Sequence, residues 1–130
     1  MNTDERGCLD DLTERVLGAV FEVANTLGSG FLEKVYQRAL LCELRLCGIR
    51  ATAEVPFRVS YKGQKVGEYF ADILVEDVLV VEIKCAERLA HVHTAQCLNY
   101  LRASGRTVCL LVNFQRPGVE WKRIVCGHAG

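Results

Sequence analysis

Apolar residues recur every three or four positions over the first part of the chain, between Asp10 and Leu27. This spacing predicts an amphipathic helix that packs one face inward. Gly28-Ser29-Gly30 follows, and a glycine just past the last periodic residue suits the left-handed cap of a helix. A second stretch of similar spacing, about Phe31 to Cys47, stops at Gly48 and predicts a second helix.

Strand-like patterns begin after Gly48. Residues Val55 to Tyr61 alternate between apolar and polar, Lys62-Gly63-Gln64 is typical of a turn, and Val66 to Val75 predicts a second strand. Glu76-Asp77 interrupts the pattern before a third strand at Leu79 to Cys85. Because this last stretch shows little polar alternation, we expect it to be covered on both faces.

The remaining chain predicts one more helix and two more strands. The helix runs from about Leu89 to Ala103, a buried strand from Thr107 to Phe114, and a half-exposed strand from Val119 to Val125. The order α-α-β-β-β-α-β-β indicates an α/β fold, in which a mixed sheet is flanked by helices and a helical crossover precedes a strand that can run parallel to the third. We expect one domain over residues 1–130, with 1–9 and 126–130 frayed.

Composition narrows the class of protein. At 130 residues and 50% hydrophobic content the chain fits one core. It has no apolar run of about 18 residues and starts with charged residues, which predicts a soluble, unexported protein with no membrane partner. Seven cysteines without a C-x-x-C pair argue against a disulfide framework or zinc ribbon and favour a reducing cytoplasm. Sixteen basic and sixteen acidic residues cancel, so a nucleic-acid partner requires a local patch.

Three charged residues interrupt the otherwise apolar strands. Glu82 and Lys84 point to one face of the third strand, because side chains alternate. A three-residue connection at residues 76–78 places Asp72 directly across from Glu82 on that face, whereas a two-residue loop turns Asp72 away. A functional site therefore requires an odd-length loop or a bulge here.

Two carboxylates about 5 Å apart repel by roughly 3 kcal/mol at an effective dielectric near 20. A hard divalent cation such as Mg²⁺ offsets this repulsion, polarises a phosphoryl oxygen and lowers the pKa of a bound water. The Lys84 ammonium can then position that water or stabilise charge on the phosphate. The alternative is an ion triad at the end of a sheet, since an acid-x-Lys spacing on a strand is common.

The segment from Gly30 to Tyr36 matches Gly-x-x-Glu-x-x-Tyr, and the chain around it resembles the GxxExxY family, which is grouped with the PD-(D/E)XK nuclease superfamily. The resemblance runs from about Leu12 to Val125 through VPFRVSYKG, FADILVED, VVEIK, HVHTAQCLNYL and LLVNF. It implies a restriction-endonuclease-like core. The chain departs from the superfamily pattern at Ala71, where a proline often precedes the aspartate.

The resemblance implies a role for each matching residue. Asp72, Glu82, Glu33 and the carbonyl of Ile83 would bind the metal, and Lys84 and Gln96 would join the acids in catalysis. Gln96 and Tyr100 resemble the Q-x-x-x-Y of nucleases related to the RecB nuclease domain. His93, Gln96 and Tyr100 also share one helical face. Tyr36, Tyr100 and His93 would be supporting residues; the alternative for each is an ordinary structural role, a tyrosine at the core edge or a hydrogen-bonded histidine.

Basic residues that could hold a phosphate backbone lie at several positions, with an ordinary solvated surface as the alternative. The sequence thus favours a Mg²⁺- or Mn²⁺-dependent nuclease that hydrolyses phosphodiester bonds, with DNA preferred over RNA as partner. The competing hypothesis is a catalytically silent module on the same fold that binds nucleic acid or protein. So small a domain also favours a homodimer or larger complex. The basic candidates are Lys34, Arg38, Arg88, Arg102 and Arg106.

Overall fold

The computed structural model describes residues 3–115 and 117–127, with side chains from residue 7 onward. Its elements follow the predicted order, α-α-β-β-β-α-β-β, so the predicted α/β fold class is confirmed. They are α1 (Thr3–Leu27), α2 (Glu33–Leu46), β1 (Ala51–Tyr61), β2 (Gln64–Val75), β3 (Leu79–Lys84), α3 (His91–Ser104), β4 (Val108–Asn113) and β5 (Glu120–Val125).

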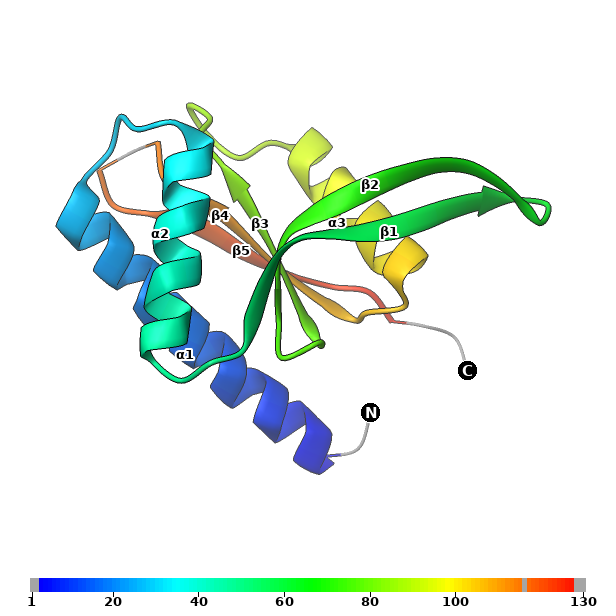
Figure 1. The fold of residues 1–130 in the computed structure, drawn as a ribbon, viewed down its shortest axis with the longest axis horizontal. Helices are drawn as coiled ribbons and strands as arrows, with labels where there is room; N and C mark the ends of the chain where they lie inside the picture. Colours follow the sequence, from blue (N-terminus) through cyan, green and yellow to red (C-terminus); the bar gives the residue numbers. More distant parts are fainter. Residues whose placement is uncertain (1–2, 116, 128–130) are drawn as a thin grey trace.

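One mixed sheet of five strands forms the centre of the molecule, in the spatial order β1-β2-β3-β4-β5 (Figure 1). Its neighbouring strands pair antiparallel except β3 and β4, which run parallel from Leu79↔Val108 to Lys84↔Asn113. A parallel pair needs a crossover, and α3 supplies it. The parallel pairing that the sequence allowed is therefore present.

Helices cover both faces of the sheet. On one face, residues of α1 and α2 such as Val16 and Leu40 pack against Val81 of β3. On the other face, Leu101 of α3 packs in a cluster that includes Val80. Val80 and Val81 are both buried, because each side of β3 has its own helical layer, as its continuous apolar run predicted.

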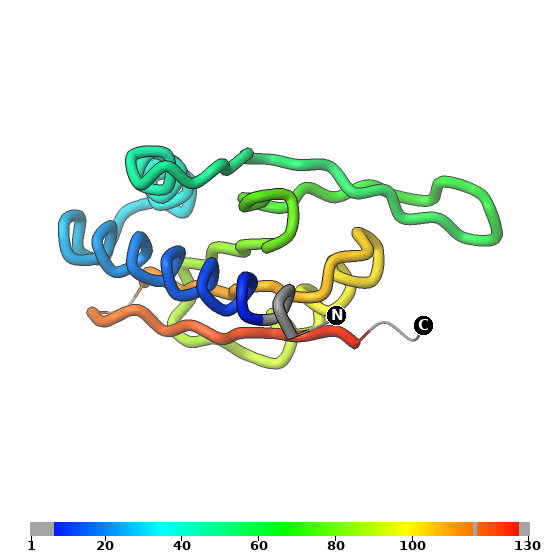
Figure 2. The backbone as a smooth tube through the Cα atoms, turned by 90° about the horizontal axis from the view of Figure 1, so that it is seen from below, coloured from blue at the N-terminus to red at the C-terminus, as the bar shows by residue number. Residues whose placement is uncertain are grey.

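The first two strands extend well beyond the rest of the sheet as a twisted hairpin. The β1–β2 pairing runs from Ala51↔Val75 to Tyr61↔Gln64, whereas β2 pairs with β3 only over Ile73–Val75. The free part, residues 55–71, is called the β-arm below, and it projects from the molecule in two perpendicular views (Figures 1 and 2).

The hairpin changes sides of the sheet where the β-arm begins. Ile73 and Val75 pack in the cluster with α1 and α2, but Ala71 and Tyr69, of the same strand parity, pack in the cluster with α3. The residue at this crossover is Asp72. On β1, Glu54 lies between the pairs Ala53↔Ile73 and Val55↔Ala71 and has a left-handed φ of 56°, an uncommon conformation for a residue with a side chain.

The observed bounds differ from the predicted ones at several ends. Residues 3–9, expected to fray, belong to α1, which begins at Thr3 instead of Asp10, and Leu9 is buried. At the other end, the amide of Cys126 donates a 2.8 Å hydrogen bond to the Thr107 carbonyl. Residues 1–2 and 128–130, also expected to fray, lie outside the described residues.

Two strands and one helix also begin elsewhere than expected. The strand β1 begins at Ala51 and not at Val55, because its first residues pair with the Ile73–Val75 end of β2. The strand β2 begins at Gln64, because main-chain pairing continues through exposed residues up to the Lys62–Gly63 turn. The helix α3 starts at His91 and not at Leu89, whose amide is bound by the Glu120 carboxylate at 2.8 Å.

No helix within the described ranges is both long and apolar enough to cross a membrane. All seven cysteines carry free thiols, so the expectation of no disulfide framework agrees with the structure.

Candidate active site

The turn at residues 76–78 sets the relation between the two predicted acids. Val75 pairs with Leu79 and Ile73 with Val81, which is the register of a three-residue connection. Asp72 and Glu82 come next in this register, where the strands begin to separate. The Asp72 amide donates to Glu82 Oε1 at 3.3 Å, and the Ile83 amide donates to Asp72 Oδ2 at 2.7 Å. The predicted loop and the predicted juxtaposition are thus both found.

The helix α2 holds the main chain of Asp72 from the other side. Gln37 Nε2 donates to the Asp72 carbonyl at 2.8 Å and to Glu54 Oε1 at 3.0 Å. Glu54 also forms an ion pair with Lys34 at 2.5 Å. Together with the two bonds to β3, this network fixes Asp72 at the point where the hairpin changes sides.

Gln37 and Glu54 were not predicted as site residues. Gln37 lies on the inward face of the amphipathic helix α2. A single polar residue at such a position does not indicate from the sequence which group it will bind. Glu54 faces Asp72 only because of the hairpin register and its own left-handed conformation, and neither can be read from the neighbouring residues.

Burial governs the charge of the two carboxyl groups. Glu82 is only 2% exposed, and its burial, then the nearby Asp72 carboxylate, raise its pKa to about 9. Burial also raises the pKa of Asp72, against the opposing effect of the hydrogen bond from Ile83. At neutral pH the metal-free pair therefore shares at least one proton, and a bound cation would favour the doubly ionised form.

The donor set of this pair fits a hard divalent metal ion. Within the described part of the chain, no hydrogen bond is donated to Asp72 Oδ1 or Glu82 Oε2, so one oxygen of each carboxylate is available. Carboxylate oxygens with a mutual repulsion to offset are the ligands that Mg²⁺ and Mn²⁺ prefer. Asp72 and Glu82 are thus suited to hold such an ion.

The other proposed ligands are less closely gathered. Glu33, the first residue of α2, is exposed, and its charge adds to the rise that burial causes in the pKa of Asp72 and Cys85. No three His, Cys, Asp or Glu side chains among the described residues converge closely enough to hold a metal ion. Ile83 contacts Asp72 through its amide, and a ligating role for its carbonyl stays a prediction.

Lys84 lies on β3, two residues beyond Glu82, and is half-buried. Its positive charge opposes the rise that burial causes in the pKa of Asp72 and Glu82, so the ammonium lies within electrostatic reach of the acids. Among the described residues, Lys84 forms no ion pair within 4 Å. The alternative hypothesis, an ion triad of Lys84 with Asp72 and Glu82, is therefore not what the structure shows.

Gln96 and Tyr100, both predicted site residues on α3, line a cavity of about 710 Å³ between this helix and the β-arm. The ring of Tyr100 stacks on that of Tyr69 at a centroid distance of 4.1 Å. Burial, then the Glu82 charge, raise the pKa of Tyr100 to about 12. Gln96 Oε1 and the Tyr69 hydroxyl are buried without a hydrogen-bond partner among the described residues. Tyr69 was not predicted, because its strand pattern is that of any half-buried tyrosine.

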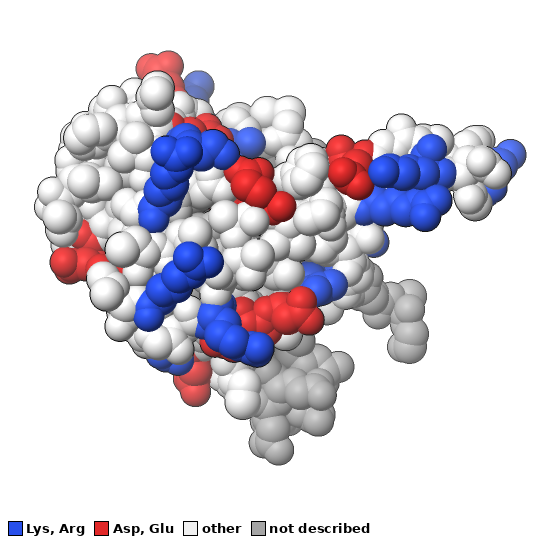
Figure 3. Space-filling model, in the orientation of Figure 1, with Lys and Arg blue, Asp and Glu red and all other residues white. Residues whose placement is uncertain are grey.

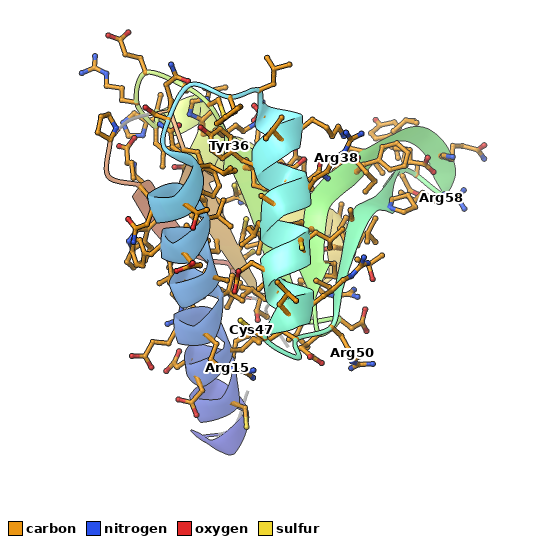
Figure 4. All side chains as sticks on the ribbon, turned by 60° about the vertical axis from the view of Figure 1, so that its left-hand side comes forward. Arg15, Tyr36, Arg38, Cys47, Arg50 and Arg58 are labelled. Carbon is orange, nitrogen blue, oxygen red and sulfur yellow. The ribbon has the colours of Figure 1, made fainter. Side chains whose placement is uncertain are left out.

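His93 and Tyr36 have structural contacts. The Ala90 amide donates to His93 Nδ1 at 3.0 Å, so His93 caps the start of α3. Tyr36, on α2 (Figure 4), is fully buried, and its hydroxyl donates to the Gly28 carbonyl at 2.7 Å and accepts from the Phe31 amide at 3.2 Å. These two hydrogen bonds fix the loop between α1 and α2, and thereby the position at which α2 begins with Glu33.

The predicted basic residues fall into two groups. Lys34 and Arg106 are engaged in ion pairs, with Glu54 and with Asp77 respectively, and Arg106 thereby holds the turn at residues 76–78. Arg38 is exposed on α2, Arg88 lies in a hollow beside Cys85, and Arg102 lines the cavity at the β-arm.

Basic side chains also gather on the β-arm, which carries Arg58, Lys62 and Lys65 (Figure 3). Arg58 was not predicted. An arginine in an alternating strand gives no sign that its hairpin leaves the sheet and faces a helix.

Comparisons with known proteins agree with this picture. A family model described as the PD-(D/E)XK nuclease superfamily matches residues 10–124. No curated protein matches the chain. The crystal structure of SSO0001 is similar with a TM-score of 0.56 and 20% identity, over 71% of this chain and 48% of that one. This chain thus spans about half the length of that protein, and the likeness concerns the fold.

An alkaline exonuclease (LHK-Exo) from Laribacter hongkongensis aligns with a TM-score of 0.42 and 17% identity, over 82% of this chain and 75% of that one. The family model, in contrast, runs from α1 into β5, a range that includes Asp72, Glu82 and Lys84. The chain therefore belongs to the PD-(D/E)XK nuclease superfamily.

Proposed function

We propose that this chain is a divalent-metal-dependent nuclease that hydrolyses phosphodiester bonds of nucleic acid, with DNA preferred over RNA. The observation that carries the proposal is the pair of desolvated carboxyl groups of Asp72 and Glu82, held together by hydrogen bonds beside Lys84. Burying two acids costs folding stability, and groups with such raised pKa values cluster at functional sites. The superfamily to which the chain belongs supports the same reading.

The proposed roles rest on the position and charge of Asp72, Glu82 and Lys84 and, for the other residues, on the resemblance to the family. Asp72 and Glu82, with the Ile83 carbonyl and Glu33 as further candidates, would hold Mg²⁺ or Mn²⁺. When bound, the metal supplies a Lewis acid for a phosphoryl oxygen and lowers the pKa of its water. The Lys84 ammonium stabilises negative charge on the phosphate and orients the attacking water. Gln96 lies on the α3 side of the site and contacts the strand being cut. The motif from Gly30 to Tyr36 supports a place in the GxxExxY group.

The test is cleavage by the purified protein. Labelled single-stranded, duplex and branched DNA and RNA are incubated with Mg²⁺ or Mn²⁺, and products are resolved on denaturing gels. We expect cleavage that Lys84→Ala abolishes. Lys122→Ala, which removes the same charge from an exposed position on β5, is the matched control and should retain it. Cleavage that persists in Lys84→Ala, or its absence from every substrate, would refute the proposal.

A catalytically silent binding module is the second candidate, and one observation favours it. Glu33 is exposed and no three potential ligands converge among the described residues, so the acids alone form an incomplete shell. Calorimetric titration with Mn²⁺ distinguishes the candidates. The nuclease binds Mn²⁺ through Asp72 and Glu82 and loses this binding in Asp72→Asn, whereas the silent module gives no heat in either protein.

A further inference from the structure

The cavity of about 710 Å³ between the β-arm and α3 is called the arm cleft below. Arg58 and Tyr69 line it from the β-arm, and Gln96, Tyr100 and Arg102 from α3. Its volume lies in the range of sites that enclose a small molecule, about 300–1,000 Å³. Tyr69 precedes Asp72 by three residues on β2, which is roughly 10 Å along the strand. The arm cleft is therefore next to the candidate active site.

Two buried polar atoms in the arm cleft have no partner. Gln96 Oε1 and the Tyr69 hydroxyl accept no hydrogen bond and donate none among the described residues. Such atoms are rare in folded proteins unless water or a ligand completes them. An amide oxygen can only accept, so its partner must be a donor, such as the amino or imino group of a base or a sugar hydroxyl. An ionised phosphate oxygen, which is an acceptor, cannot satisfy it.

The walls and rim of the arm cleft provide the two other features of a nucleotide site. Tyr69 and Tyr100, stacked at 4.1 Å, supply aromatic surface of the kind on which unpaired bases stack. Arg58 and Arg102 supply positive charge for phosphates, and Arg58 stands on the exposed β-arm (Figure 4). No Asp or Glu is among the described residues that line the cleft. Although the chain has no net charge, the arm cleft is therefore locally positive and suited to an anion.

We propose that the arm cleft binds one unpaired nucleotide of the strand being cut, so that the substrate is single-stranded or carries a single-stranded end. Base donors would meet Gln96, the ring would lie against the tyrosines, and the flanking phosphates would meet Arg58 and Arg102. In a duplex the faces of a base are stacked and its pairing edge is occupied, so it could reach this cleft only after being extruded. The inference rests on the proposed nuclease function and specifies its substrate.

Binding without metal tests the inference apart from cleavage. Fluorescence anisotropy in EDTA compares a short labelled oligothymidine, the same oligomer with abasic sites, and a duplex of equal length. We expect the oligothymidine to bind about 5- to 150-fold more tightly than the abasic oligomer, the range expected from stacking one base. Gln96→Ala should reduce this preference for the base. Circular dichroism of each variant verifies the fold.

The arginines are tested by salt dependence. Each of Arg58→Ala and Arg102→Ala should weaken binding of both single-stranded oligomers. Each should also make the negative slope of the logarithm of the binding constant against log[salt] shallower by about 0.7, because one phosphate contact is lost. Lys122→Ala is the matched control and should leave the slope unchanged. Equal affinity for normal and abasic oligomers, tighter binding of the duplex, or an Arg58→Ala variant that behaves as Lys122→Ala would each overturn the inference. If the protein prefers the normal single strand but cleaves no substrate, the nuclease proposal is refuted and nucleotide binding in the arm cleft stands. If it cleaves a substrate without this preference, nucleotide binding in the arm cleft is refuted and the nuclease proposal stands.

Discussion

Glu82→Gln is expected to stabilise the metal-free protein, and to do so more strongly as the pH rises. Burial and the Asp72 charge raise the Glu82 pKa from 4.5 to about 9, so the folded protein keeps a proton that the unfolded chain releases between these values. The unfolded state then binds fewer protons, and the free energy of unfolding of the wild type falls by about 1.4 kcal/mol per pH unit. Below pH 4.5 this contribution to stability is fully present.

The accumulated loss reaches about 4 kcal/mol near a pH of about 7.5. Glutamine does not ionise in either state, and its amide oxygen can still accept the hydrogen bond from the Asp72 amide. Glu82→Gln therefore avoids the loss. The difference in free energy of unfolding between variant and wild type should grow by about 1.4 kcal/mol per pH unit up to about pH 9 and then level off.

Urea unfolding in EDTA, followed at a series of pH values, measures this difference. Glu14→Gln, at an exposed position on α1, is the matched control. Excess Mn²⁺ should raise the free energy of unfolding of the wild type, because an ion that binds only the folded state stabilises it, but should leave Glu82→Gln unchanged. A difference between variant and wild type that stays constant with pH would refute the reasoning on burial.

Three further outcomes are expected. Tyr36→Phe should lower the free energy of unfolding in urea by about 2 kcal/mol, because two main-chain groups of the loop before α2 lose their partner, whereas Tyr61→Phe, at an exposed site, should change it little. Asn113→Ala should cost about 3 kcal/mol and speed hydrogen exchange at Ala86, since the fully buried amide binds both the amide and the carbonyl of that residue; unchanged exchange would contradict the assigned contacts. Chelation by EDTA should abolish cleavage while the far-UV circular dichroism stays unchanged, because the core is formed by apolar contacts; loss of helical signal would instead indicate a structural metal.

The sequence was sufficient for features that depend on local periodicity. Element order and the burial of β3 on both faces follow from apolar spacing. The sequence left the connection before β3 open between two and three residues, and the structure has three. Given this three-residue connection, strand alternation places Asp72 and Glu82 on one face, since the side-chain period of a strand fixes which residues share a face.

The features that the sequence did not reveal depend on where strands separate. Tyr69 and Arg58 line the arm cleft only because the part of β2 before Ile73 does not pair with β3 and the hairpin turns over α3. The left-handed Glu54 and its contacts with α2 belong to the same bend. The bend of the hairpin depends on many weak contacts between residues far apart in the sequence, so no short motif predicts it.

The change of sides at Asp72 has a mechanical consequence. The acid is anchored to α2 and β3 by three hydrogen bonds, while the hairpin beyond it is joined to the body through its own ladder and the packing on α3. Bending of the hairpin about this point would widen or narrow the grip on a bound strand and leave the reacting groups in place. On the proposed function, substitutions of Arg58 and Tyr69 on the hairpin would change substrate binding, whereas substitutions of Asp72, Glu82 and Lys84 would change bond cleavage.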